Sequence, residues 1–203
     1  MKCKYITIER EYGSGGTQIA RRLAEQTGIP CYGYEILDEV SKKYGIPADK
    51  LESYEETSTG SLLYSIYMMA QAASYNSDML TKEGHIYVAE QAVIQQFAAN
   101  SRAIFLGHCA SEALKKQQGV INVFIRCTDT EEKNQRIIYD YGIPAEKAEA
   151  VSRRYNKKRS NYYYANTAQK WDDLRNYDIV LDSGKLGIDR CVEILKAVTD
   201  CEK

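Results

Sequence analysis

A chain of 203 residues is long enough for one sizeable domain and short for two ordinary ones. With 44% hydrophobic and 27% charged residues, it falls in the globular range and can bury a core. The formal net charge of −1 argues against a protein that coats nucleic acid or an anionic membrane. No apolar run approaches the roughly 18 residues of a membrane span, and the N-terminus carries no apolar signal segment, so we expect a cytoplasmic protein.

Apolar runs of strand length alternate with helical patterns along the chain. The runs predict strands over residues 4–8, 31–32, 103–106, 120–125 and 178–182. Apolar side chains spaced by about 3.6 residues predict helices between them, over residues 17–26, 34–44, 130–141 and 188–198, and a long helical region that includes residues 62–70 and 86–97. Five short apolar strands separated by helices indicate an α/β fold with a parallel sheet covered on both faces.

Two connections are too long to be simple crossovers between parallel strands. They span about residues 45–101 and about residues 142–172. Sheets of this kind bind ligands at the carboxyl ends of their strands. We therefore expect both segments to lie over that edge, as flaps on a single domain that comprises residues 1–203.

A glycine-rich stretch follows the first predicted strand and precedes the first predicted helix. Residues 9–17 read E-R-E-Y-G-S-G-G-T. Glycines let the backbone curl until successive N–H groups face one anion, and the start of the helix adds further N–H groups. The stretch thus predicts a phosphate-binding loop built from Gly13, Ser14, Gly15, Gly16 and Thr17. The alternative is a tight strand-to-helix turn with no ligand.

The loop matches the pattern G-x-x-x-x-G-K-[ST] only in part. Gly15 and Thr17 fit, and Thr17 can offer its hydroxyl to a magnesium ion. Arg10 stands at the first glycine position and Gly16 at the lysine position. Arg10 is therefore a candidate catalytic cation that approaches the phosphates in place of the lysine. The alternative for Arg10 is a structural ion pair with Glu9, Glu11 or an acid of the predicted lid.

The sequence resembles the cytidylate kinase-like family, a branch of the nucleoside monophosphate kinases. In that family the loop characteristically reads G-S-G-G. The resemblance is carried by residues 6–17, by residues 159–163, by Thr167 and Trp171, and by residues 177–188. It implies a P-loop NTPase fold of three layers, α/β/α, in which residues 45–101 form a helical acceptor-binding insertion and residues 142–172 a lid. It also implies transfer of a phosphoryl group from ATP, with Mg²⁺, to a nucleoside monophosphate, CMP by the family name.

The resemblance also points to two candidate substrate-binding residues. Tyr34 follows the second predicted strand where charged residues are common in the family, and His108 stands where the family tends to have arginine. His108 can bind an acceptor phosphate as imidazolium, since the ordinary pKa of histidine lies near 6.5. The alternative is that His108 only caps the end of its strand.

A basic and aromatic segment lies in the predicted lid. Residues 153–159 read R-R-Y-N-K-K-R, which places five cations in seven residues. In a helix, Tyr155, Arg159 and Tyr162 share one face. Arg154 and Arg159 are candidate catalytic residues that a closing lid would bring to the phosphates. The alternative is a solvated helix face.

The sequence leaves two main functions open. The first is a kinase that uses ATP and Mg²⁺, with CMP or dCMP as the leading acceptor. The second is a regulatory protein that binds nucleotide or phosphate on a kinase scaffold with weak or no catalysis. A nucleic-acid-binding module finds support only in the basic segment. We expect small-molecule nucleotide substrates, no nucleic-acid or membrane partner, and possible homodimers.

Overall fold

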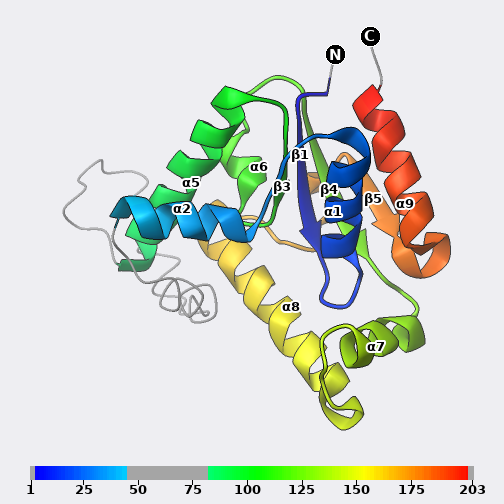
Figure 1. The fold of residues 1–203 in the computed structure, drawn as a ribbon. Helices are drawn as coiled ribbons and strands as arrows, with labels where there is room; N and C mark the ends of the chain where they lie inside the picture. Colours follow the sequence, from blue (N-terminus) through cyan, green and yellow to red (C-terminus); the bar gives the residue numbers. More distant parts are fainter. Residues whose placement is uncertain (1–2, 45–81, 201–203) are drawn as a thin grey trace.

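The computed structural model describes residues 3–44 and 82–200 of the chain (Figure 1). Its five strands pair in parallel in the order β2-β3-β1-β4-β5. They confirm the predicted strands with small shifts at the ends, and their bounds are β1 (Tyr5–Arg10), β2 (Cys31–Tyr32), β3 (Ala103–Leu106), β4 (Val120–Arg126) and β5 (Ile179–Asp182).

Helices join the strands. They are α1 (Gly16–Thr27), α2 (Tyr34–Tyr44), α5 (Lys82–Asn100), α6 (Ala110–Ala113), α7 (Thr130–Tyr139), α8 (Ala145–Thr167) and α9 (Ser183–Asp200), with a 3-10 turn, η2 (Leu174–Asn176). The short α6 and η2 escaped prediction because a single turn has no measurable periodicity. The last helix begins earlier than predicted, at Ser183, and its helical geometry is interrupted at Gly187. The helix expected over residues 62–70, and most of the predicted insertion, lie outside the described residues.

Helices cover both faces of the sheet (Figure 1). Side chains of β1 alternate between these faces, as the two-residue period of a strand requires. Ile6 and Ile8 pack into a core with α1 and α9. On the opposite face, Tyr5 packs with side chains of α2, α5 and α6, and this second core contains the fully buried Phe105 of β3. β1 is therefore the central strand, with hydrogen-bonded neighbours on both edges.

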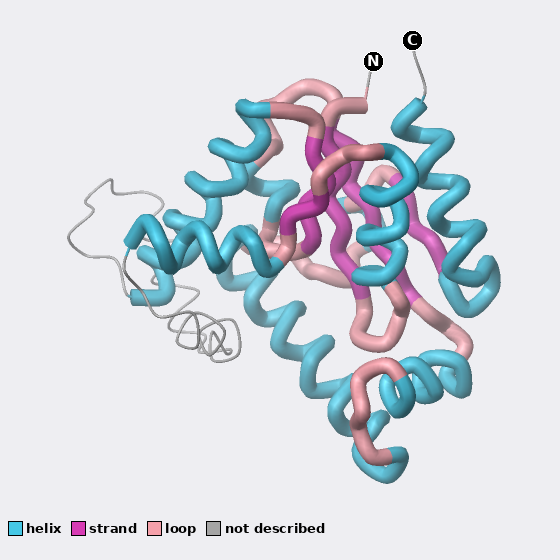
Figure 2. Tube along the Cα trace, in the orientation of Figure 1, coloured by secondary structure: helices cyan, strands magenta, loops and turns pink. Residues whose placement is uncertain are grey.

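The carboxyl ends of the strands meet at one edge of the sheet, where α7 and α8 also lie (Figure 1). Figure 2 shows the loops after β1 and β4 at this edge, whereas both termini lie at the opposite one. The predicted lid segment is occupied mainly by α8. No helix within the two described ranges is long and apolar enough to cross a membrane.

Replacement of Phe105 tests the core that supports β3. The Phe105 side chain is fully buried. We expect Phe105→Ala to lower the free energy of unfolding by about 3 to 5 kcal/mol, because the lost aromatic ring leaves a cavity. Denaturant titration followed by circular dichroism measures it. The matched control is Tyr139→Ala, at a side chain that is 80% exposed, which should change stability by less than about 0.5 kcal/mol.

Candidate functional site

The glycine loop connects β1 to α1 through two left-handed residues. Gly13 has φ 77° and Gly15 has φ 74°, a region that side chains disfavour. The buried Ser14 fixes the curl, because its Oγ donates to the carbonyl oxygen of Glu11 at 2.8 Å and accepts from the N–H of Gly16 at 3.3 Å. Among the described residues, no oxygen accepts from the backbone N–H of Gly13 or Gly15. The loop therefore keeps the amides that an anion needs.

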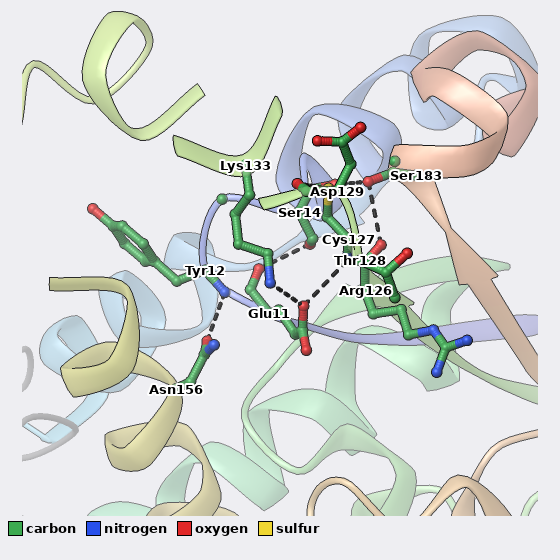
Figure 3. Close-up of polar contacts among 12 residues, drawn as sticks. Glu11, Tyr12, Ser14, Arg126, Cys127, Thr128, Asp129, Lys133, Asn156 and Ser183 are labelled. Carbon is green, nitrogen blue, oxygen red and sulfur yellow. Dashed lines mark hydrogen bonds and ion pairs between the residues drawn. The ribbon is translucent and has the colours of Figure 1, made fainter. Parts of the chain in front are cut away.

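Three other elements hold the loop from outside (Figure 3). The carboxylate of Glu11 accepts from Lys133 Nζ of α7 at 2.7 Å and from the backbone N–H of Cys127, which follows β4, at 3.1 Å. Ser183, at the start of α9, donates its hydroxyl to the carbonyl oxygen of Ser14 at 2.6 Å. The loop is thus fixed through a side chain and a carbonyl oxygen, and these contacts do not use the backbone N–H groups of its glycines.

Helix α8 contacts the loop directly. Asn156 Oδ1 accepts from the backbone N–H of Tyr12 at 2.7 Å, as Figure 3 shows. Arg159 donates to the carbonyl oxygen of Arg10 at 2.8 Å. The rings of Tyr12 and Tyr155 stack with centroids 4.6 Å apart. Burial raises the pKa of Tyr12, as do its tyrosine neighbours, although Arg159 opposes the shift, so the phenol stays neutral. The basic helix therefore meets the loop.

The side chain of Arg10 fills the space that a side chain at residue 16 would need. A Cβ atom on Gly16 would lie 2.5 Å from Cβ and 2.9 Å from Cγ of Arg10. The Arg10 stem therefore fills the position from which a lysine at residue 16 would start. Its Nη1 reaches the end of β3, within 2.5 Å of a Cβ placed on Gly107, and its buried Nε has no hydrogen-bond partner in the described part of the chain. Glu9 and Glu11 bond to Trp171 and Lys133 instead. Within the described residues, Arg10 forms no ion pair with either of them or with an acid of the lid segment.

Two cavities meet beside the loop. The larger, of about 380 Å³, opens between β1, β3, α1, α2 and α8. The smaller, of about 220 Å³, lies against Gly16 and Tyr12. Arg10, Thr17 and Arg159 line both. The three side chains therefore stand where the two spaces adjoin.

The structure brings most of the predicted site residues together. Gly16 lines the smaller cavity, and Tyr34 and His108 line the larger one. Tyr155, Arg159 and Tyr162 do share a face of α8, which they turn toward the larger cavity. Gly13, Ser14 and Gly15 line neither cavity. Nor does Arg154, whose guanidinium lies over the ring of Tyr155, 5.3 Å from the centroid.

His108 stands in a strained turn at the end of β3. Gly107, His108 and Cys109 have successive φ values of 81°, 57° and 50°. Such a conformation is uncommon for residues other than glycine, and strained residues cluster at functional sites. The imidazole Nδ1 lies 3.4 Å from a carboxylate oxygen of the fully buried Glu90, which also accepts from the hydroxyl of Tyr162. His108 is thereby held at the cavity wall.

Sequence reasoning missed several lining residues, among them Glu9, Arg21 and Lys158. Arg21 follows Thr17 by four residues on α1, so helical spacing from the predicted magnesium ligand was an available signal. A second signal was available for Glu9, which places an acid in the apolar pattern of a buried strand. Lys158 belongs to the basic segment but was not singled out.

Thr17 remains the candidate for a magnesium ion. Thr17 lines both cavities, each with one acidic residue in its wall, Glu9 in the larger and Glu11 in the smaller. The described residues contain no group of three or more histidine, cysteine, aspartate or glutamate side chains that could hold a metal by themselves. This fits Mg²⁺, which protein sites often bind through few side chains together with substrate phosphates and water.

Comparisons with known proteins place the chain. No curated protein matches it. A crystal structure of an uncharacterized protein from Eubacterium ventriosum is 26% identical, with a TM-score of 0.72 over 98% of this chain and 99% of that one. A shikimate kinase from Bacteroides thetaiotaomicron, 11% identical, shares the fold with a TM-score of 0.54 over 97% and 98% of the two chains. The P-loop NTPase fold is thus confirmed. Residues 5–185 match the cytidylate kinase-like family, to which this chain therefore belongs.

Proposed function

We propose that the protein is an ATP- and Mg²⁺-dependent phosphotransferase that acts on a nucleoside monophosphate, with CMP or dCMP as the leading acceptor. Its scaffold is that of a nucleotide or small-molecule kinase. One observation carries the proposal: two cavities adjoin at the glycine loop, and Arg10, Thr17 and Arg159 line both. This arrangement suits a group that passes from a donor on one side to an acceptor on the other.

Phosphoryl transfer depends on the positioning of the reactants and on positive charge around them, more than on covalent catalysis. Phosphoryl transfer is accelerated by cations around the transferring group, and an arginine there contributes about 10³ to 10⁵ in the rate of GTPases. Arg10 and Arg159 stand at the junction of the cavities. The loop amides and Thr17 would hold the donor phosphates with Mg²⁺, which supplies further charge neutralisation when bound.

The larger cavity suits an anionic acceptor of modest size. Its volume of about 380 Å³ lies within the range of small-molecule sites. Besides the two shared arginines, Arg21 and Lys158 line it, so cations outnumber the single carboxylate of Glu9. The tyrosine rings of Tyr34 and Tyr162 in its wall offer apolar surface to a base.

The second candidate, a regulatory protein that binds nucleotide without turnover, is favoured by the contacts of α8. Asn156 and Arg159 bond to backbone atoms of the loop region, and no lysine follows the loop glycines. Catalysis separates the two candidates.

Nucleotide binding and turnover test the proposal directly. Titration calorimetry with ATP, ADP and CMP, in the presence of Mg²⁺, should show binding of all three. A coupled assay of ADP release across nucleoside monophosphates should then show release that depends on the acceptor, fastest with CMP or dCMP. Binding of ATP without turnover on any acceptor would favour the regulatory alternative, and absence of binding would overturn both.

We further propose that Arg10 substitutes for the loop lysine. Arg10→Ala should weaken ATP binding at least about tenfold, because a charge-assisted contact with phosphate is lost. Gly16→Lys alone should weaken ATP binding further than Arg10→Ala does, since its Cβ would lie 2.5 Å from Cβ of Arg10. The double variant Arg10→Gly, Gly16→Lys removes that clash, returns one cation and should recover much of the affinity. Titration calorimetry with ATP measures all three.

The control for these variants is Arg190→Ala, which removes an exposed cation of α9. It should leave ATP affinity unchanged. Unfolding midpoints of every variant separate a loss of binding from a loss of fold. A double variant that binds no better than Gly16→Lys would show that residues 10 and 16 are not interchangeable sources of the cation.

A further inference from the structure

Glu9 is a buried acid in the wall of the larger cavity. It precedes Arg10 on β1, and its side chain is only 7% exposed. The surrounding side chains are aromatic and include the buried Trp171 and Tyr163. Burial raises the pKa of Tyr163 to about 12, a bond to Ser111 lowers it and the charge of Glu9 raises it, so that phenol is neutral.

One hydrogen bond fixes the carboxylate. Trp171, 4% exposed, donates its indole N–H to Glu9 Oε2 at 3.0 Å. No ion pair joins Glu9 to a cation in the described part of the chain, although four cationic side chains line the same cavity. Oε1 accepts no hydrogen bond from the described residues either. Thus one oxygen is anchored, and the other is available to whatever enters the cavity.

The contact with Trp171 does not require a charged group. Burying a carboxylate costs free energy that one neutral N–H donor does not offset. A glutamine would keep the bond to Trp171 without that cost. A buried carboxylate with one oxygen facing a cavity points to a ligand, because a donor group of a molecule in the cavity can bond to that oxygen.

We propose that Glu9 determines acceptor specificity by accepting a hydrogen bond from an N–H or O–H group of the acceptor, with Trp171 as the residue that positions it. The assignment rests on the proposed function, in which the larger cavity holds the acceptor. The role of Glu9 sets a second requirement for the acceptor, besides its negative charge. The acceptor carries a negative group toward the cations and an amino, imino or hydroxyl donor toward Glu9.

The variant Glu9→Gln tests this assignment because it keeps size and the indole contact. Its amide oxygen can still accept from Trp171, whereas its NH₂ turns a donor toward the cavity. We expect kcat/KM for the acceptor that the wild type uses best to fall at least about tenfold, through loss of a charge-assisted hydrogen bond. The loss should appear mainly in the KM of the acceptor, and the calorimetric affinity for ATP should stay unchanged.

The source of the donor group is read from a panel of CMP, dCMP and UMP. CMP and dCMP share the cytosine amino group and differ in the 2′-hydroxyl, whereas UMP has a carbonyl oxygen in place of the amino group and a ring N–H. If Glu9 reads the amino group, Glu9→Gln should abolish a preference of CMP and dCMP over UMP. If it reads the 2′-hydroxyl, only the preference of CMP over dCMP should vanish. If it reads the ring N–H, a preference of UMP over CMP should vanish.

Two controls isolate the effect. Glu193→Gln removes an exposed carboxylate of α9 and should leave the kinetics as they are. Trp171→Phe keeps Glu9 but frees it, and should raise the KM of the acceptor by a smaller factor. The unfolding midpoint of each variant checks the fold.

The outcomes distinguish this assignment from the function on which it rests. Wild-type turnover that Glu9→Gln leaves unchanged would overturn the role of Glu9 alone. A shifted Mg²⁺ dependence with an unchanged acceptor KM would also overturn it, since Glu9 would then serve the metal. A wild type that neither turns over nor binds any nucleotide of the panel would overturn the proposed function and the role of Glu9 together.

Discussion

The alternation of side chains along the central strand is the constraint on which the site depends. β1 pairs with β3 over residues 5–8 and with β4 over residues 5–10, so its register is fixed. Successive residues of a strand point to opposite faces. Arg10 therefore turns toward Gly16 of α1, whereas Glu9 turns toward Trp171. Two adjacent residues of opposite charge are kept apart by the sheet and do not neutralise each other, which leaves both charges to the cavities.

Most of the contacts that other elements make with the glycine loop go to its backbone atoms. Asn156, Ser183 and Arg159 contact backbone atoms of the loop or of the strand end before it. Side-chain chemistry enters through Glu11, which joins α7 to the end of β4. Because backbone atoms are present whatever the residue, these outside contacts do not depend on which side chains the loop carries. The Ser14 hydroxyl acts inside the loop, where it bonds to Glu11 and Gly16. Its shape is set by the glycines, by the Ser14 hydroxyl and by the elements around them.

Much of the fold was predictable from the sequence, because the strands are short, apolar and separated by periodic helices. The loop was also predictable, because its glycines follow one another closely between a predicted strand and a predicted helix. The contacts that define the site were not predictable, since they depend on how distant elements pack. Asn156 reaches Tyr12 only through the orientation of α8, and Arg154 turns to Tyr155 instead of the cavity. The role of Glu9 needed the position of Trp171, which no local pattern specifies.

The exclusion between Arg10 and a side chain at residue 16 also limits how loops of this type can interconvert. An ancestor with lysine at residue 16 and glycine at residue 10 is separated from this chain by two replacements. If residue 10 becomes arginine first, the intermediate carries Arg and Lys side chains that clash. If residue 16 becomes glycine first, the intermediate has no clash but carries neither cation. The second route is sterically open but weakens phosphate binding on the way. A lineage that crosses by that route must tolerate reduced affinity for a time, or carry a neighbouring cation such as Arg159 that bridges the gap.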